Sequence, residues 1–152
     1  MLPSEPASIA HQQHRLIQEI YLLLHDGDRQ LLSLLQLTPL EFSVLQRLDP
    51  TRGRRLTDIG AELLCVKSTI TRLVDRLESH GLVLRTPDPD DRRAQRLVLT
   101  ARGLALRDEA ARLHDEAVER RLGQLDSEEQ EQLRALLEKL RQGLQRDLLG
   151  VG

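Results

Sequence analysis

The chain has 152 residues, a formal net charge of −2 and 39% hydrophobic residues, which suits one folded domain with a sizeable core. Its aromatic side chains are Tyr21 and Phe42, which argues against a protein that stacks single-stranded nucleic acid on aromatic platforms. One cysteine, no apolar run of bilayer length and no basic-then-apolar leader argue against a disulfide scaffold or a membrane partner, and we expect a cytoplasmic protein.

The first part of the chain is predicted to be helical. Met1–Pro6 is expected to be a loosely attached lead, and from Ala7 to about His25 apolar residues recur on one helical face. The triplet Asp26-Gly27-Asp28 predicts a kink or short break, because glycine in a helix interior costs about 1 kcal/mol relative to alanine. Leucines between positions 31 and 35 then continue the apolar face.

The next helix has a well-defined start. Thr38-Pro39-Leu40-Glu41 combines an N-capping threonine, a proline at the first helical position and a glutamate placed to close a capping box. We expect this helix to run to about Leu48 and to end before Asp49-Pro50. The basic Thr51–Arg55 link that follows is expected to be flexible, and contact with phosphates and a solvated loop are equally good interpretations of it.

The segment from Leu56 to Ser79 predicts two helices joined by a tight turn. Thr57 is expected to cap the first helix, and the second begins at Ser68. Apolar residues at spacings of three and four form one stripe along the second helix: Ile70, Leu73, Val74 and Leu77. Its other side carries short hydroxyls and arginines, which suit base edges and phosphates in a major groove. An ordinary amphipathic surface helix is the alternative for this segment taken alone.

A charged hairpin follows this helix. Gly81 is expected at the helix C-terminus, and strands are predicted from Leu82 and over Arg96–Leu99. In the tip, Asp91 lies two residues before Arg93, close enough to orient its guanidinium by a charge-assisted hydrogen bond. A calcium loop is an alternative for the tip aspartates, but the glycine and distal glutamate of such a loop are missing. The pattern predicts a winged helix-turn-helix whose tip arginines enter a minor groove.

The remainder of the chain is predicted to form two helices. Thr100 is expected to cap a helix from about Ala101 to Leu122, and Ser127 with Gln130 is expected to form a capping box at the start of the last helix. The apolar faces of the two terminal segments and of the helix from Ala101 exceed what a small winged domain can cover, so we expect a dimer interface of interleaved helices. An intramolecular helical bundle in a monomer is the alternative.

Basic residues concentrate in the middle of the chain. Residues 52–107 contain 12 Lys/Arg and 7 Asp/Glu, whereas the other segments contain 10 and 17. This distribution indicates a DNA-facing central segment in spite of the negative net charge. In a chain with 30% charged residues the same split also arises by chance.

Three stretches resemble the MarR family of bacterial transcriptional regulators: LTPLEFSVLQRL (37–48), KSTITRLVDRLESHGLV (67–83) and DPDDRRAQRLVLTARG (88–103). The Asp91-x-Arg93 pair followed by Leu99-Thr100-x-x-Gly103 is similar to the wing signature of that family. Two features depart from the family pattern: Val66 stands where many members have an N-capping Asp or Ser, and Asp26-Gly27-Asp28 interrupts a helix that is usually continuous.

The resemblance implies a mainly α, homodimeric protein with a small β-wing, whose terminal helices form the dimer and whose wings straddle a pseudo-palindromic operator. It also implies that small, often aromatic or anionic effectors bind between the dimer helices and the winged domain. The sequence assigns no pocket residues and implies no cofactor. The expected division is an N-terminal dimerisation region (1–37), a winged helix-turn-helix domain (38–103) and C-terminal dimerisation helices (104–152).

The combined interpretation is a dimeric transcriptional regulator that binds duplex DNA, with repression as the favoured outcome. Base and adjacent phosphate contacts are assigned to the exposed side of the second helix: Ser68, Thr69, Thr71 and Arg72, with Lys67 and Arg76 on phosphates. Arg93 is expected to insert into the minor groove, held by Asp91, with Arg92 and Arg96 on the DNA backbone.

Two other function classes stay open. One is a winged-helix module in which the same helix binds a partner protein. The other is a small enzyme or zinc sensor that uses His11 and His14, three residues apart, although no further ligand, phosphate loop or nucleophile motif supports it. Cys65, in the predicted turn, is interpreted as a structural thiol in preference to an oxidant sensor.

Overall fold

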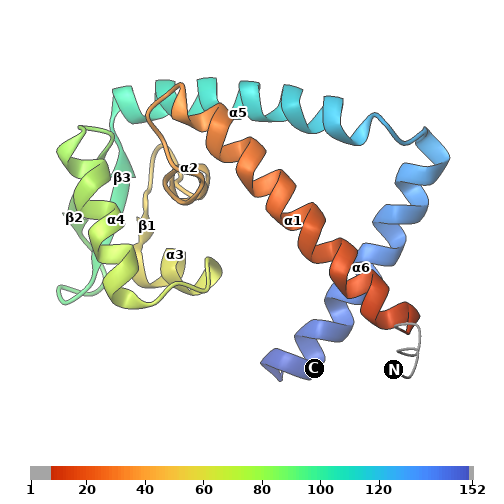
Figure 1. The fold of residues 1–152 in the computed structure, drawn as a ribbon. Coiled ribbons are helices and arrows are strands. Elements are labelled where there is room, and N and C mark those ends of the chain that lie inside the picture. The colour runs from red at the N-terminus through yellow and green to blue at the C-terminus, as the bar shows by residue number, and fades with distance from the viewer. Residues whose placement is uncertain (1–7, 151–152) are drawn as a thin grey trace, which may run out of the picture. The chain divides into compact units, whose positions relative to one another are not determined.

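The computed structural model describes residues 8–150, which form six helices and three strands (Figure 1). In chain order these are α1 (Ile9–Ser33), α2 (Pro39–Gln46), β1 (Arg54–Arg55), α3 (Leu56–Glu62), α4 (Lys67–Ser79), β2 (Val83–Pro87), β3 (Gln95–Leu99), α5 (Ala101–Leu122) and α6 (Ser127–Leu149). The mainly α fold with a helix-turn-helix and a small wing is confirmed. The expected lead Met1–Pro6 lies outside the described residues.

The described chain divides into two compact units, residues 8–114 and 115–150. The first unit holds a continuous apolar core to which α1, α2, α3, α4, both wing strands and the start of α5 contribute. The residues with almost no exposed side-chain surface include Leu32, Leu45, Ile59, Leu77 and Leu97. Each buried side chain of this size stabilises the folded protein by about 1.5–3 kcal/mol relative to leaving it exposed. This core therefore fixes the positions of the elements around it.

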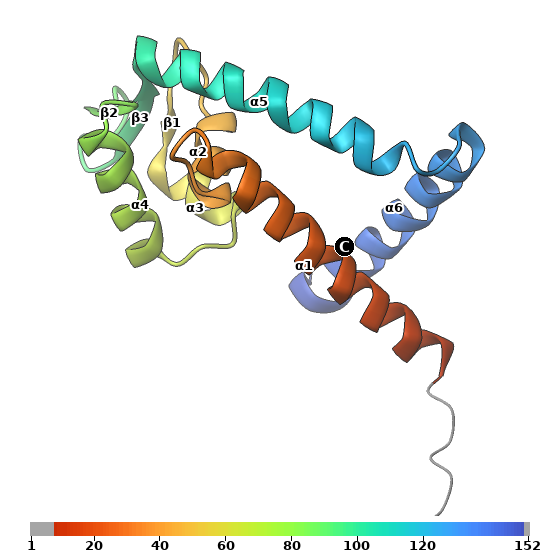
Figure 2. The same cartoon turned by 45° about the horizontal axis from the view of Figure 1, so that its top comes forward.

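The three strands form an antiparallel sheet in the order β1-β3-β2 (Figure 2). In the hairpin, Val83 faces Leu99 and Pro87 faces Gln95. Strand β1 was not predicted from the sequence. Arg54 and Arg55 pair with Leu97 and Arg96 of β3 instead of forming a flexible link. The loop before it is also tied, since the Asp49 carboxylate accepts hydrogen bonds from the Thr51 and Arg52 backbone N–H groups.

The predicted break at Asp26-Gly27-Asp28 is wrong, because α1 is continuous from Ile9 to Ser33. The Asp26 carboxylate accepts hydrogen bonds of 2.6 Å from Arg29 and from Gln30, one turn further along the helix. Pairs at this spacing support a helix, and Leu32 anchors its end in the core. These interactions outweigh the cost of Gly27.

The helix caps divide into confirmed and corrected predictions. Thr38 caps α2 in a capping box with Glu41, as expected. Thr57 does not cap α3: the chain passes directly from β1 into the helix, and Arg55 occupies the N-cap position without a capping hydrogen bond from its side chain. The last capping box lies one residue earlier than predicted, because the Asp126 carboxylate accepts the Glu129 N–H while Glu129 bonds back. Asp and Ser are about equally good N-caps, so the sequence left this choice open.

The junction between α4, the wing and α5 explains the Leu-Thr-x-x-Gly signature. Gly81 has φ +69° and ends α4, with hydrogen bonds from its own N–H to Glu78 and from the Leu82 N–H to Leu77. The Thr100 hydroxyl donates to the Gly81 carbonyl at 2.6 Å and accepts the Gly103 N–H at 2.9 Å, so the expected cap of α5 is confirmed. A Cβ on Gly103 lies 1.8 Å from the Leu82 carbonyl oxygen. Only glycine therefore lets α5 approach the wing this closely.

We expect Gly103→Ala to lower the free energy of unfolding by about 3 kcal/mol or more, because the added methyl displaces backbone instead of a flexible side chain. Gly143→Ala in α6 is the matched control, since its Cβ meets nothing within 4 Å and alanine is favoured in a helix by roughly 0.5–1 kcal/mol. Urea unfolding of both variants checks this. Equal stability of the two variants contradicts the close approach described here.

Candidate nucleic-acid interface

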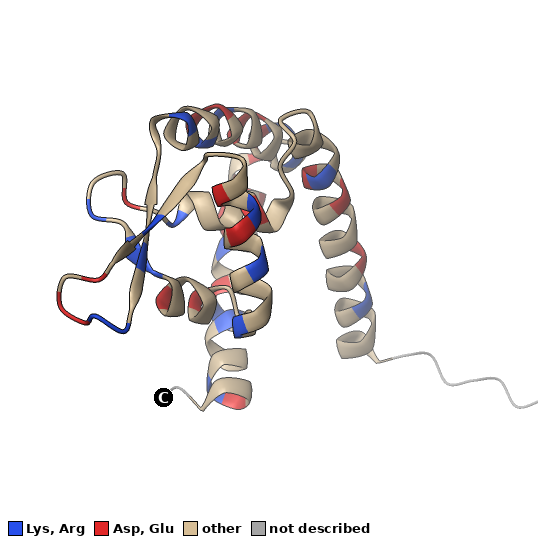
Figure 3. Ribbon diagram, turned by 90° about the vertical axis from the view of Figure 1, so that its left-hand side faces the viewer, with Lys and Arg blue, Asp and Glu red and all other residues tan. Residues whose placement is uncertain are grey.

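The helix α4 presents one buried and one exposed face. Ile70, Val74 and Leu77 are buried in the core. Of the residues assigned to DNA, Lys67, Ser68, Thr71, Arg72 and Arg76 are exposed and Thr69 is half-buried. Figure 3 shows charged positions on this helix and on the adjoining wing. The predicted stripe and its polar opposite face are therefore present together.

The exposed start of α4 has little internal bonding. The Thr71 hydroxyl donates to the Lys67 carbonyl at 2.8 Å, which turns it partly back onto its own helix. Val66 occupies the N-cap position and makes no side-chain bond, so the departure from the family pattern noted in the sequence is real.

The second half of α4 is fixed to α2 by an ion pair. The Arg76 Nε lies 2.9 Å from Glu41, whose carboxylate is almost completely buried and also receives the Thr38 N–H. Glu41 thus serves the α2 cap and holds α4 at the same time. The phosphate contact assigned to Arg76 stays a prediction, made by a side chain that remains 55% exposed beside Glu41.

The wing holds α4 from its other side through Arg85, a residue that the sequence did not single out. From β2, its guanidinium bonds the carboxylates of Asp75 and Glu78, and its backbone N–H donates to Glu78 at 3.2 Å. Two acidic side chains on the exposed helix are thereby paired with a cation. The spacing of Asp75 and Glu78, three residues apart and therefore neighbours on a helix, was the signal available for this site.

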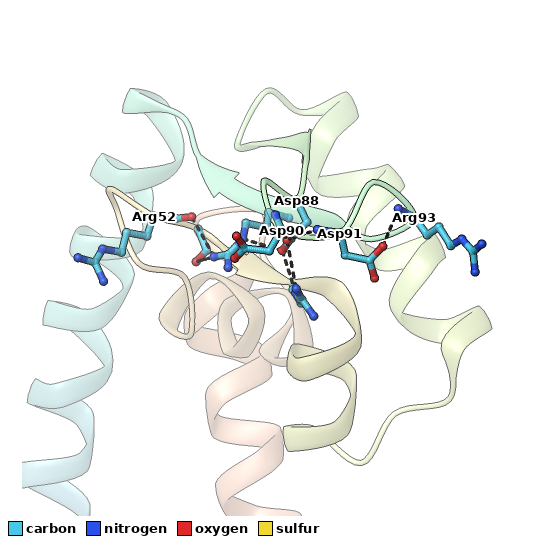
Figure 4. Close-up of polar contacts among 8 residues, drawn as sticks. Arg52, Asp88, Asp90, Asp91 and Arg93 are labelled. Atoms are coloured by element: carbon cyan, nitrogen blue, oxygen red, sulfur yellow. Dashed lines mark hydrogen bonds and ion pairs between the residues drawn. The ribbon is translucent and has the colours of Figure 1, made fainter.

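The wing itself is organised by the buried carboxylate of Asp88 (Figure 4). Arg55 of β1 and Arg96 of β3 each place Nε 2.8 Å from Asp88 Oδ2. The backbone N–H groups of Asp90 and Asp91 donate to Oδ1 at 2.9 and 3.1 Å. The hydrogen bond from Arg55, with those from Asp90 and Arg96, lowers the pKa of the Asp88 carboxyl well below its usual range. Asp88 therefore stays ionised while it closes the wing.

The tip differs from the sequence prediction in what Asp91 holds. Its carboxylate accepts the Arg93 backbone N–H at 2.9 Å, in place of the predicted bond to the Arg93 guanidinium. An Asp side chain that bonds the backbone two residues on forms a tight turn, and this turn competes with the longer reach to the side chain. Figure 4 shows the Arg93 side chain directed away from the Asp88 cluster. Arg92 and Arg93 are both exposed.

Arg96 is placed inside the wing. Besides Asp88, its guanidinium lies 3.4 Å from the carbonyl oxygens of Arg52 and Gly53. Its expected contact with the DNA backbone stays a prediction, but its partners give it an internal function that the sequence did not indicate. Arg55, assigned only to a flexible link, has the same function from β1.

The remaining candidates make other contacts. His11 lies 2.7 Å from the Ser8 hydroxyl, and residues 8–150 contain no group of three or more side chains placed to hold a metal ion. The half-buried Cys65 thiol donates to the Leu63 carbonyl at 3.5 Å. Among the described helices, none is long and apolar enough to cross a membrane.

Comparison with known proteins gives consistent matches. A sequence model of the MarR family matches residues 37–94. The HTH-type transcriptional regulator YkoM of Bacillus subtilis is 36% identical over 101 residues, 66% of this chain and 66% of that protein. The regulator MhqR of the same organism is 31% identical over 104 residues, 68% and 72% of the two chains. Among solved structures, the S. aureus MepR–DNA complex has a TM-score of 0.79 at 26% identity, over 91% of this chain and 100% of that one.

We expect Asp88→Asn to lower Tm by about 5 °C and to weaken DNA binding about tenfold, because Arg55 and Arg96 lose their shared anion. Asp90→Asn is the matched control: it removes the same charge from the same tip, where only the backbone of Asp90 takes part in the cluster. Calorimetry and DNA titration of both variants check this. Equal losses of Tm and DNA affinity in the two variants would show that the loss comes from net charge, which contradicts the organising function of Asp88.

Proposed function

This chain belongs to the MarR family of winged helix-turn-helix transcriptional regulators, and we propose that it acts in the cytoplasm as a homodimeric repressor on a pseudo-palindromic operator. Like its relatives it is a DNA-binding transcriptional regulator. A small aromatic or anionic effector is proposed to release it. Such an effector acts only through its different affinity for the DNA-competent and incompetent geometries.

One observation supports the DNA-binding surface above others. A helix with an exposed polar start is fixed from two sides, by Glu41 and by Arg85, next to a wing whose tip exposes two arginines. Rigid placement of this kind suits a helix in a major groove with a wing tip in the adjacent minor groove. The DNA-bound state of the similar MepR structure supports the same interpretation.

The proposed dimer rests on apolar surface that each terminal helix exposes. In α1 the large apolar side chains with more than a third of their surface exposed include Ile9, Leu16, Ile17, Ile20 and Leu24. In α6 they are Leu136, Leu137, Leu140, Leu144, Leu148 and Leu149. Contiguous apolar faces of this kind mark association surfaces, and a two-fold dimer predicts half-sites about 10 bp apart.

The proposed function is tested by anisotropy titrations of an operator-containing duplex and a scrambled duplex at several salt concentrations. We expect Arg93→Ala to weaken specific binding by about 1–3 kcal/mol, and Lys67→Ala to weaken binding to both duplexes alike and to reduce the salt slope by about one unit. Arg134→Ala in α6, which removes an exposed cation elsewhere, is the control. Equal affinity for the two duplexes, unchanged by either substitution, points to a protein-interaction module instead.

The dimer is tested separately by sedimentation equilibrium. We expect Leu140→Arg to shift the protein toward monomer by at least tenfold in dissociation constant, because a charge on the apolar face of α6 must be desolvated to re-form the interface. Gln142→Arg adds the same charge to the same helix outside that face and should leave the dimer intact. A wild-type protein that is monomeric at micromolar concentration overturns this part of the proposal.

A further inference from the structure

The turn between α3 and α4 contains two residues, Leu64 and Val66, that are unfavourable for stability at their positions. Leu64 has φ +52°, a left-handed conformation that is unfavourable for a residue with a Cβ. It follows the last turn of α3, with its N–H bonded to Ala61 and the Cys65 N–H bonded to Gly60. This is the helix ending that ordinarily takes glycine. The sequence places a leucine there instead.

The second unfavourable choice follows two residues later. Val66 occupies the N-cap of α4 with extended backbone and no side-chain hydrogen bond, where a Ser, Thr, Asp or Asn ordinarily satisfies the first N–H groups of the helix. Neither side chain recovers this loss by burial, since Leu64 is 79% exposed and Val66 is 66% exposed. The folded protein gains nothing visible from either residue. Local rules broken at nearby exposed positions are typical of functional sites.

The position of these residues indicates what they contact. The turn leads directly into α4 (Figure 2), and Lys67 and Ser68 follow as its first, exposed residues. The N-terminal residues of a recognition helix are those that meet base edges in a major groove. The apolar group on the floor of that groove is the C5 methyl of thymine, and apolar side chains are its usual partners.

We propose that Val66 and Leu64 form an apolar contact that reads thymine methyl groups in the operator half-site. The proposal rests on the DNA-binding function above and assigns to that function two specificity-determining residues. The contact removes methyl and side-chain surface from water, which is worth about fourfold in affinity for each methyl group buried. Valine at the cap and leucine in the turn are then retained for recognition at the expense of stability.

The test separates recognition from stability. The operator is first selected with the wild-type dimer from a random duplex library, and each thymine of a half-site is then replaced by deoxyuridine, which removes only the methyl group. We expect one or two replacements to weaken wild-type binding about fourfold each. Val66→Ser should bind the thymine and deoxyuridine duplexes with less than twofold difference at the position that Val66 contacts, and Leu64→Gly should show the same loss at the position that Leu64 contacts.

Both substitutions should also raise the urea midpoint of the free protein, because serine caps α4 and glycine relieves the left-handed turn. Ser79→Ala, at the C-terminal end of the same helix, is the control for a polar residue and should keep the thymine preference. Wild-type binding that is indifferent to deoxyuridine at every position overturns the proposal while leaving DNA recognition intact. Failure to select any duplex overturns both. Variants that gain stability but retain the full thymine preference overturn the assignment of this contact to Leu64 and Val66.

Discussion

The buried carboxylate of Asp88 joins segments of the chain that lie far apart in sequence, since Arg55 comes from β1, Arg96 from β3 and the Asp90 and Asp91 N–H groups from the tip. A buried carboxylate is costly unless it is paired and fully hydrogen-bonded, and here it accepts five hydrogen bonds from four residues. The conformation of the tip is therefore fixed by the same group that joins the outer strand to the hairpin. The backbone that carries the exposed Arg92 and Arg93 is thereby held in place, although their side chains are not.

Helix α4, the proposed recognition helix, is positioned by a comparable arrangement of opposite charges. Arg76 reaches back to the buried Glu41, and Arg85 reaches forward from β2 to Asp75 and Glu78. Each pair joins α4 to a different neighbour, so rotation of the helix about its axis breaks at least one of them. Pairing also offsets the acidic residues of α4, which otherwise repel phosphates. The same contacts thus set both the position and the charge of the surface that we propose to face DNA.

The sequence predicted what local chemistry determines. The Thr38 capping box, the end of α4 at Gly81, the Thr100 cap and the uncapped Val66 each depend on residues within a few positions of one another, and all are present. The wing strands and the amphipathic α4 followed from periodicity. Where two neighbours were equally good caps, as at positions 126 and 127, the local signal was ambiguous and the choice was wrong by one residue.

Several features that the sequence did not predict depend on distant partners. Asp88 pairs with Arg55 33 positions earlier, and β1 has only two residues, too few for a periodic signal. Arg96 and Arg76 looked like free cations because their anionic partners lie on other elements. Asp91 was placed beside the correct residue but bonds its backbone instead of its side chain, since a tight turn is reached with less ordering of the chain.

The lowered pKa of Asp88 has a consequence for the conditions under which the wing keeps its charge. A carboxyl whose pKa is lowered in the folded state contributes its full stabilisation at a pH above its pKa in the unfolded chain. This contribution is lost as the pH falls through the lower pKa of the folded state. Residues 83–99 contain no histidine or cysteine, so the wing has no side chain that ordinarily titrates between pH 5 and 8. Ionic strength, which screens the field of exposed arginines beyond about 10 Å at 0.1 M, is therefore the solution variable to which we expect the wing to respond.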